Sequence, residues 1–528
     1  MFYHPSSFLT NTGIMEGDSY IERKIDFVTG HTGSNIWDIT QVTMVAPAAA
    51  LLWAVLQTRQ RFFDPYTPAS YLADFLLQVG AILFAVTAYA DNPTVLIGLL
   101  LVPAIGTVVN GDNIDHRFTK PAKPPVKEEA TGPVEPVDLV PIKPFITTYR
   151  GAMMIITCIS ILAVDFPVFP RRFAKVENWG VSLMDLGVGS FVFGAGMVYA
   201  RQALKEEDED APKVSFANRM NSAVMHSLPM LALGFLRLWT VKGLEYQEHV
   251  TEYGVHWNFF FTLGLLPPFV TILQPLIKYI PSYSALGFAL LIPYEMLFTY
   301  SDIGFYMFMA PRDDFISANR EGIFSFLGYL AIFIVGQGIG MEALRRDVNA
   351  VSPMTHNDEW VAEMLGGEDS LKEIRKTREH NSMFKLAKWT GLWIVMYVFL
   401  TWHYGPRLTV SRRLANMPYL AWVAAFNCGQ LLLFRVIEGI LFPFLYTSRD
   451  KKVEKERVSK ATSKVLNAFN RNGLAIFCLA NVLTGLVNMT LPTLDMNDYQ
   501  AMAVLISYMS ILTGVGLFLD QRNITIKL

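Results

Sequence analysis

The sequence predicts an all-α integral membrane protein that crosses the bilayer many times and forms a single membrane-embedded domain over residues 1–528. Hydrophobic residues make up 52% of the chain and charged residues only 17%, whereas soluble domains carry about 25% charged residues. Apolar runs of about 20 residues, the length that crosses the hydrocarbon core as a helix, recur along the chain. The loops between these runs alternate in charge. A soluble or largely disordered protein is therefore excluded.

Thirteen apolar runs are predicted to span the membrane. Residues 1–40 are polar and mixed in charge and show no cleavable signal peptide, so we expect the first run to start insertion itself. The run 437–446 is too short to span. The predicted spans are 41–57, 71–90, 94–110, 151–166, 181–200, 221–240, 255–276, 283–300, 322–342, 384–403, 418–436, 471–490 and 500–519.

The distribution of basic residues predicts the orientation of these spans. Loops on the same side as the C-terminus hold 30 of the 44 Lys and Arg residues, and loops on the other side hold 11. Basic loops stay in the cytosol, so the N-terminus is predicted to be luminal and the C-terminus cytosolic. The main cytosolic loops are then 111–150, 201–220, 343–383 and 447–470.

Charge and cysteine content exclude several other functions. The formal net charge of −2 gives no indication of nucleic-acid binding. Cys158, Cys428 and Cys478 lie far apart inside apolar runs and form no metal-binding spacing, so no metal site is expected. Motifs of soluble enzymes, such as a P-loop or GxSxG, are absent from the sequence.

The segment DFPVFPRRFAKVENWGVSLMDLGVGSFVFGAG, residues 165–196, concentrates charge on the predicted luminal side. Two prolines, Pro167 and Pro170, make the loop stiff. Ionisable groups beside a span are costly and usually functional. In the alternative interpretation, the two arginines anchor to lipid phosphates and the acids pair with them. The charged residues are Asp165, Arg171, Arg172, Lys175, Glu177 and Asp185.

Other polar residues enter predicted spans near their luminal ends. His256 and Asn258, with Glu252 nearby, indicate either a polar cavity or ordinary structural side chains. Glycines at 187, 189, 194 and 196 predict close helix packing. For each of a further set, taken singly, we expect hydrogen bonds to neighbouring helices. This set comprises Asn319, Arg320, Glu321, Arg412, Arg413, Asn472, Asn481 and Asn488.

The segment 165–196 resembles the signature of the inositol acyltransferases of glycosylphosphatidylinositol (GPI) anchor biosynthesis, the family of the fungal GPI-anchored wall transfer proteins and mammalian PIG-W. EYGVHWNFFFTL, ANREGIFSFLGYL, SRRLANMPYLAWV and NGLAIFCLANVLTGLVN also resemble family segments, in the family's order. The resemblance covers residues 20 to 520. It implies a multi-pass enzyme of the endoplasmic reticulum membrane that moves palmitoyl from palmitoyl-CoA to the inositol ring of glucosaminyl-phosphatidylinositol. Palmitoyl-CoA is then a substrate, and no resident cofactor is expected.

The resemblance also suggests how the charged segment works. Asp165 is the candidate general base and Lys175 the cation that stabilises the oxyanion or orients Asp165. Arg171 and Arg172 are expected to hold a phosphate. His256 is the second candidate for the base. We also expect Glu177, Asp185, His256 and Asn258 to contact substrate. The thiolate of CoA leaves readily, so direct attack by the inositol hydroxyl is expected.

Two other functions use the same residues. A transporter or lipid flippase would place intramembrane charges along a substrate path, but the internal repeats common in transporters are not visible in the sequence. A purely structural scaffold would leave the charged luminal segment unexplained.

Overall fold

A computed structural model describes residues 20–110, 140–206, 215–243, 250–345, 368–403, 405–443, 445–446 and 451–526. Within these residues the chain is helical apart from loops and one isolated β-bridge between Ser34 and Val181, which confirms the all-α prediction. The predicted loops 111–150, 201–220, 343–383 and 447–470 lie partly outside the described residues.

The helices before the charged loop are α1 (Tyr20–Val28), α2 (Ile36–Thr43), α3 (Val45–Gln60), α4 (Pro68–Phe75), the π-helix η1 (Leu76–Gly80), α5 (Ala81–Val86), α6 (Pro93–Asn110) and α8 (Pro144–Ala163). The next are η2 (Arg171–Phe173), α9 (Leu183–Glu206), α10 (Phe216–Gly243), α11 (Val250–Tyr253), α12 (Phe259–Leu273), η3 (Gln274–Lys278), α13 (Tyr283–Tyr300), α14 (Ile303–Met309), α15 (Phe315–Ala318) and α16 (Arg320–Leu344). The last are α18 (Glu368–Thr401), α19 (Met417–Leu441), α20 (Lys451–Lys460), α21 (Lys464–Arg471), α22 (Gly473–Thr490), η5 (Thr493–Asp495) and α23 (Asp498–Gln521).

Ten helical stretches in the described residues are long and apolar enough to cross a membrane. They correspond to ten of the thirteen predicted spans. The other three, 94–110, 221–240 and 283–300, are helical and lie in α6, α10 and α13. A multi-pass membrane protein is therefore supported, and the count of thirteen and the orientation of the termini stay predictions.

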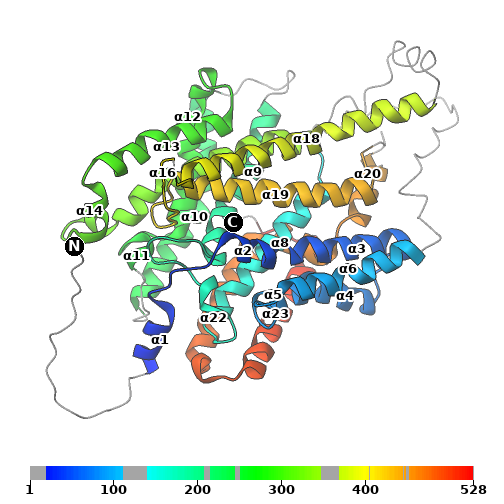
Figure 1. Cartoon of the computed structure of the whole chain (residues 1–528), viewed down its shortest axis with the longest axis horizontal. Coiled ribbons are helices and arrows are strands. Elements are labelled where there is room, and N and C mark those ends of the chain that lie inside the picture. The colour runs from blue at the N-terminus through cyan, green and yellow to red at the C-terminus, as the bar shows by residue number, and fades with distance from the viewer. Residues whose placement is uncertain are drawn as a thin grey trace.

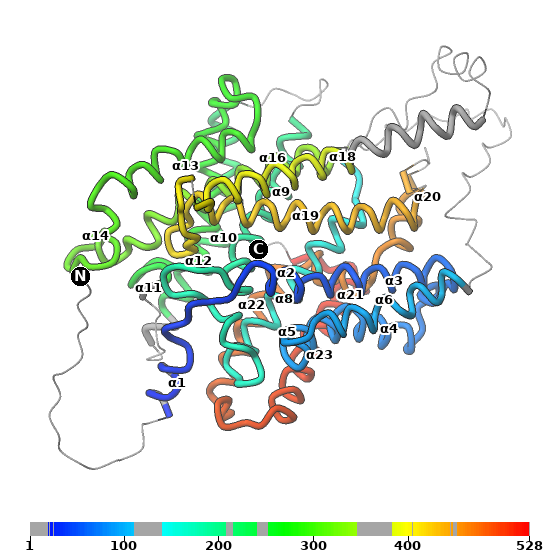
Figure 2. The backbone as a smooth tube through the Cα atoms, in the orientation of Figure 1, coloured from blue at the N-terminus to red at the C-terminus, as the bar shows by residue number. Residues whose placement is uncertain are grey.

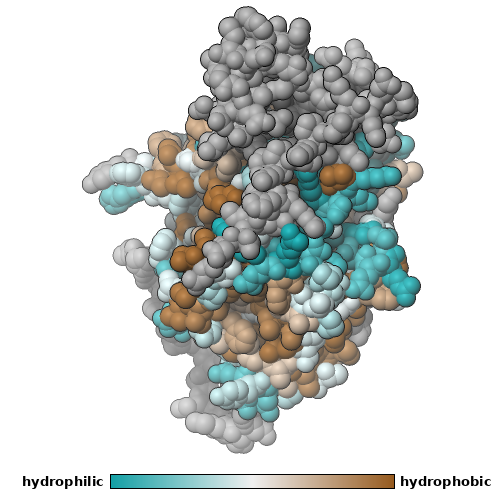
Figure 3. Space-filling model, turned by 90° about the vertical axis from the view of Figure 1, so that its right-hand side faces the viewer, coloured by the Kyte–Doolittle hydropathy of each residue, from teal (hydrophilic) through white to brown (hydrophobic). Residues whose placement is uncertain are grey.

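Several long helices, among them α3, α6, α16, α18 and α19, run along the longest axis of the molecule (Figure 1). The short helices α1, α11 and α14 lie at the left end, whereas α20 and the start of α18 lie toward the right. Figure 2 shows α3–α6 in blue and α12–α14 in green on opposite sides of the molecule. Between them, α19 contacts α3, α8, α9, α16 and α18. Figure 3 views the right-hand end, where hydrophilic residues gather in the middle of the face and hydrophobic residues lie below and to the left.

Glycines allow α9 to pack closely on its neighbours. A Cβ atom at Gly196 would collide with the carbonyl of Phe333 in α16, and one at Gly189 would collide with Val423 in α19. These two glycines confirm the predicted close packing, because only a missing side chain lets the backbones approach so closely. The prediction is wrong for Gly187 and Gly194, since nothing lies within 4 Å of a Cβ atom at either position. Those two glycines face open space on the helix.

Candidate functional site

The charged segment forms a loop, residues 164–182, between the end of α8 and the start of α9. Arg171 shapes this loop through main-chain contacts. Its guanidinium donates to the carbonyl oxygens of Val164 (2.8 Å), Phe166 (3.0 Å) and Phe169 (2.7 Å). A helix leaves its last carbonyls without internal partners, and Arg171 supplies donors at that point. Burial lowers the pKa of Arg171 to about 10, while the charge of Asp165 opposes this shift, so the guanidinium stays protonated at neutral pH.

Arg172 ties the loop to the N-terminal helices. Its Nε donates to Oδ2 of Asp38 (2.8 Å), and its Nη2 donates to the carbonyl of Ala90 (3.0 Å) and to Oδ1 of Asp91 (2.7 Å). Both arginines therefore direct donors at oxygens of the protein itself. A substrate phosphate would compete with these oxygens, and the predicted phosphate-binding role stays a prediction.

Asp165 lies two residues beyond the C-terminal end of α8 and is only 8% exposed. Its Oδ2 accepts a hydrogen bond of 2.8 Å from Nδ2 of Asn488, in the last turn of α22. The Oδ1 atom of the same Asn488 accepts a hydrogen bond of 2.8 Å from Nζ of Lys24 in α1. Asp165, Asn488 and Lys24, from three distant parts of the sequence, thus form a chain of hydrogen bonds with Asn488 in the middle.

Lys175 is held by an acid from another element. Its Nζ lies 2.8 Å from Oε1 and 3.0 Å from Oε2 of Glu252, in the short helix α11. The Lys175 side chain remains 37% exposed. The ammonium therefore lies at the surface of the loop with Glu252 as its ion-pair partner, an interaction that the sequence analysis did not predict.

Asp185 is fully buried in the first turn of α9 and fixes the main chain beside Lys175. Its Oδ2 accepts hydrogen bonds from the Val176 amide (3.1 Å) and from Oγ of Ser182 (2.7 Å). Its Oδ1 accepts a bond of 2.6 Å from Nε of Arg412. A buried carboxylate needs such partners to stay charged. These contacts give Asp185 a bracing role, and substrate contact stays a prediction.

The remaining predicted substrate-binding residues have structural partners. Asn258 caps α12, accepting from the amides of residues 260 and 261 and donating to the carbonyl of Gly234 at 2.9 Å. The main-chain amide of His256 donates to Oδ1 of Asn319 at 2.7 Å, and its ring stacks on Phe315. The Oε2 atom of Glu177 accepts a bond of 3.2 Å from the amide of Gly30. These contacts fit the structural alternative for His256 and Asn258.

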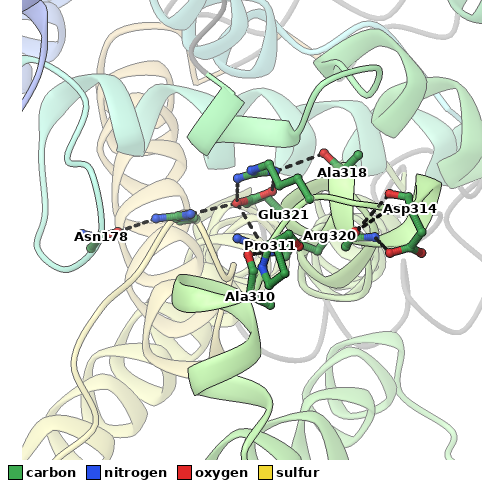
Figure 4. A network of polar contacts seen from close by, with 10 residues as sticks. Asn178, Ala310, Pro311, Asp314, Ala318, Arg320 and Glu321 are labelled. Atoms are coloured by element: carbon green, nitrogen blue, oxygen red, sulfur yellow. Dashed lines mark hydrogen bonds and ion pairs between the residues drawn. The ribbon is translucent and has the colours of Figure 1, made fainter.

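An arginine network anchors the loop from the other side (Figure 4). Glu321 is fully buried at the start of α16. Its carboxylate pairs with Arg413 at 2.8 Å, with Nη1 of Arg312 at 3.0 Å and with Arg320 at 3.7 Å. Arg413 also donates to Oδ1 of Asn178 in the charged loop at 2.6 Å.

Arg320, Glu321 and Arg413 were each expected to contact a neighbouring helix, and their convergence with Arg312 and Asn178 was not predicted. Residues 320–321 and 412–413 both precede apolar runs, 322–342 and 418–436, that start on the same predicted side of the membrane. That shared side was the sequence feature that could have indicated their contact. Two further hydrogen bonds join the charged loop to the segment before α19: Oγ of Ser411 donates to the carbonyl of Asn178 at 2.6 Å, and the amide of Gly180 donates to the carbonyl of Val410 at 2.9 Å. Segments 178–180, 320–321 and 410–413 therefore form one unit.

The site thus offers a carboxylate and an ammonium on one short, braced loop. A carboxylate can accept a proton from a hydroxyl group, and an ammonium can stabilise a developing negative charge. In the described part of the chain, no group of three or more His, Cys, Asp or Glu residues is arranged to hold a metal ion.

Comparison with known proteins places this site in a family. The GWT1 family model matches residues 20–519. A protein of Gibberella zeae named GPI-anchored wall transfer protein 1 is 49% identical over 97% of this chain and 99% of its own length. Proteins of the same name from Aspergillus fumigatus and Saccharomyces cerevisiae are 46% and 39% identical, each over 96% of this chain and 99% of their own length. These full-length matches show that the chain belongs to the GWT1 family.

Proposed function

We propose that the protein is a membrane-bound acyltransferase of GPI-anchor biosynthesis in the endoplasmic reticulum membrane. It would move palmitoyl from palmitoyl-CoA to the inositol ring of glucosaminyl-phosphatidylinositol. The observation that carries the proposal is the family match over residues 20–519, which includes the whole charged loop. The relatives are named for GPI-anchored wall transfer, and a membrane lipid acceptor suits a chain whose described residues include ten membrane-length helices.

The proposed chemistry is direct acyl transfer from a thioester to an alcohol. The inositol hydroxyl oxygen bonds to the thioester carbonyl carbon while its proton passes to Asp165. The tetrahedral intermediate carries negative charge on oxygen, which the Lys175 ammonium stabilises. The carbon–sulfur bond then breaks, and CoA leaves as a thiolate that takes up a proton. No acyl-enzyme is needed.

The surroundings of Asp165 and Lys175, described above, support these roles. Asp165 is 8% exposed, so its carboxylate is shielded from bulk water without being sealed off. Lys175 is paired with Glu252 and 37% exposed, which keeps the ammonium at the loop surface where a substrate carbonyl can approach. Both substrates carry phosphate groups, the lipid acceptor and CoA alike. Arg171 and Arg172 are proposed to bind a phosphate of one of them.

The decisive experiment uses the full-length protein purified in detergent, labelled palmitoyl-CoA and glucosaminyl-phosphatidylinositol. We expect labelled inositol-acylated product, and about 10²–10⁴-fold less from Asp165→Asn at the same protein concentration. A transporter or flippase moves substrate between compartments and makes no product in detergent. Absence of product from a folded protein that binds both substrates would therefore overturn the proposal in favour of transport.

A further inference from the structure

The amide group of Asn488 lies between the carboxylate of Asp165 and the ammonium of Lys24. Its Nδ2 donates to Oδ2 of Asp165 at 2.8 Å, and its Oδ1 accepts from Nζ of Lys24 at 2.8 Å. Asp165 is almost fully buried, whereas Asn488 and Lys24 are half-buried. The three side chains come from the end of α8, the end of α22 and α1.

The chemistry of the two neighbours determines how the amide must face. An ammonium has three donors and no acceptor, and an ionised carboxylate has acceptors only. The Asn488 oxygen must therefore face Lys24, and its NH₂ group must face Asp165. If the amide turned over, both contacts would become repulsive, so Lys24 holds the donor of Asn488 on Asp165.

Helix α1 is itself held in place, which gives Lys24 a defined position. Arg23 makes two hydrogen bonds with the Asp495 carboxylate, at 3.0 and 3.2 Å, just beyond the end of α22. Phe27 lies against the guanidinium of Arg171, 3.8 Å from the ring centroid. The Tyr20 hydroxyl accepts from the amide of Leu494 at 3.4 Å. Helix α1 thus joins the charged loop to the segment that follows α22 (Figure 1).

We propose that Asn488 is a positioning residue for Asp165 and that Lys24 fixes the orientation of Asn488. This inference rests on the proposed function, because it concerns the residue that accepts the hydroxyl proton. The hydrogen bond restricts rotation of the carboxylate, so its oxygens keep a constant direction toward the acceptor site. It also favours the ionised form of Asp165, the form that can accept a proton.

Charged groups near the Asp165 carboxylate also affect its pKa and must be considered in a pH measurement. Arg171 acts on Asp165 electrostatically from the same loop, and Lys24 faces it through Asn488 from α1. Asn488 is the neutral contact from α22. Removing the Asn488 donor leaves both cations in place but removes a hydrogen bond to the ionised form, so the pKa of Asp165 must rise.

The test compares Asn488→Leu with Asn481→Leu in the purified enzyme. Asn481 lies in the same helix, is exposed and donates to the carbonyl of Phe477 one turn earlier in that helix, so it is a matched control. In metal sites, outer-shell groups that orient a ligand contribute about 10–100-fold to affinity or activity, and we expect an effect of the same order from a hydrogen bond that orients Asp165. We expect kcat to fall by that factor in Asn488→Leu, with the KM for palmitoyl-CoA within about twofold of wild type and the acid limb of the kcat–pH profile moved to higher pH. Asn481→Leu should match wild type.

Two Lys24 variants and one further Asn488 variant complete the experiment. Lys24→Met should lower kcat in the same direction but less, and Lys24→Arg should retain activity because it keeps a donor. If Asn488→Leu fails to fold, Asn488→Asp carries the test: a second carboxylate raises the pKa of Asp165 further, so the acid limb must move up. An unchanged kcat and acid limb in the folded Asn488 variant, with Asp165→Asn inactive, would overturn this inference alone. Wild-type turnover in Asp165→Asn would instead overturn the assigned base.

Discussion

Asp165 and Lys175 are ten positions apart on one loop, yet each is held by a different part of the chain. Asn488 in α22 contacts Asp165, and Glu252 in α11 contacts Lys175. Neither partner follows from the spacing of the loop residues, because both contacts cross long stretches of sequence. The loop residues themselves were predictable from charge in an apolar setting and from the family resemblance.

Asp165→Asn is expected to leave the protein folded and able to bind acyl-CoA but to reduce transfer by about 10²–10⁴-fold, since only the proton acceptor is lost. Lys175→Ala should cost about 10²–10³-fold through loss of the cation at the oxyanion. The double variant should be little worse than the worse single variant, because both residues act on one transition state. Single-turnover rates with labelled palmitoyl-CoA measure all three. An inactive His256→Ala beside an active Asp165→Asn would move the base to His256.

Arg171→Lys is expected to lower the melting temperature and kcat together. An ammonium cannot reach the three carbonyls that the planar guanidinium bonds at once. Arg23→Lys is the matched control for the melting temperature, because its ion pair with Asp495 is 47% exposed and such pairs contribute roughly 0–1 kcal/mol. Thermal unfolding in detergent and steady-state kinetics check this. A raised KM at an unchanged melting temperature would instead show that Arg171 binds a substrate phosphate.

At the scale of elements, the positions of the helices were predictable and their contacts were not. Every span that was predicted from an apolar run overlaps a helix in the structure, including the three in α6, α10 and α13. The Glu321 network was missed because its arginines come from α16, from the segment before α15 and from the loop before α19. Hydropathy reports the local environment of a segment, whereas an ion-pair network depends on how segments are arranged in three dimensions.

Gly196→Ala should destabilise the pair α9–α16, since the added Cβ would meet the carbonyl of Phe333. Overpacking of this kind costs about 1–3 kcal/mol. Gly194→Ala, two residues away, meets nothing within 4 Å and should be neutral or gain up to about 1 kcal/mol from helix propensity. The two melting temperatures, measured in the same detergent, should therefore move apart. Equal melting temperatures would show that α9 and α16 can separate without cost.

At the scale of the whole molecule, the ends of the long helices define two faces. The charged loop, α1 and α11 belong to one face, and α20 with the start of α18 belongs to the other (Figure 1). The basic-residue bias predicts that the face with α1 is luminal.

Epitope tags provide a direct measurement of orientation. A tag within 111–139 or within α20 should be digested when protease is added to intact microsomes, and a tag in the first 19 residues should be protected. The reason is the division of Lys and Arg residues, 30 against 11, between the two sets of loops. Tagged proteins that retain acyl transfer activity are the control for correct insertion. Protection of the α20 tag would reverse the assignment.

The contacts of the charged loop also impose an order on biosynthesis. The loop leaves the ribosome early, but Asp185 meets Arg412 227 positions later, Asn178 meets Arg413 235 positions later and Asp165 meets Asn488 323 positions later. Until Arg412, Arg413 and Asn488 are translated, Asp185, Asn178 and Asp165 lack these partners. A nascent chain that ends before α22 therefore carries every candidate catalytic side chain but lacks Asn488, the contact of Asp165, so the charged loop gains its full set of contacts only after α22 has been made.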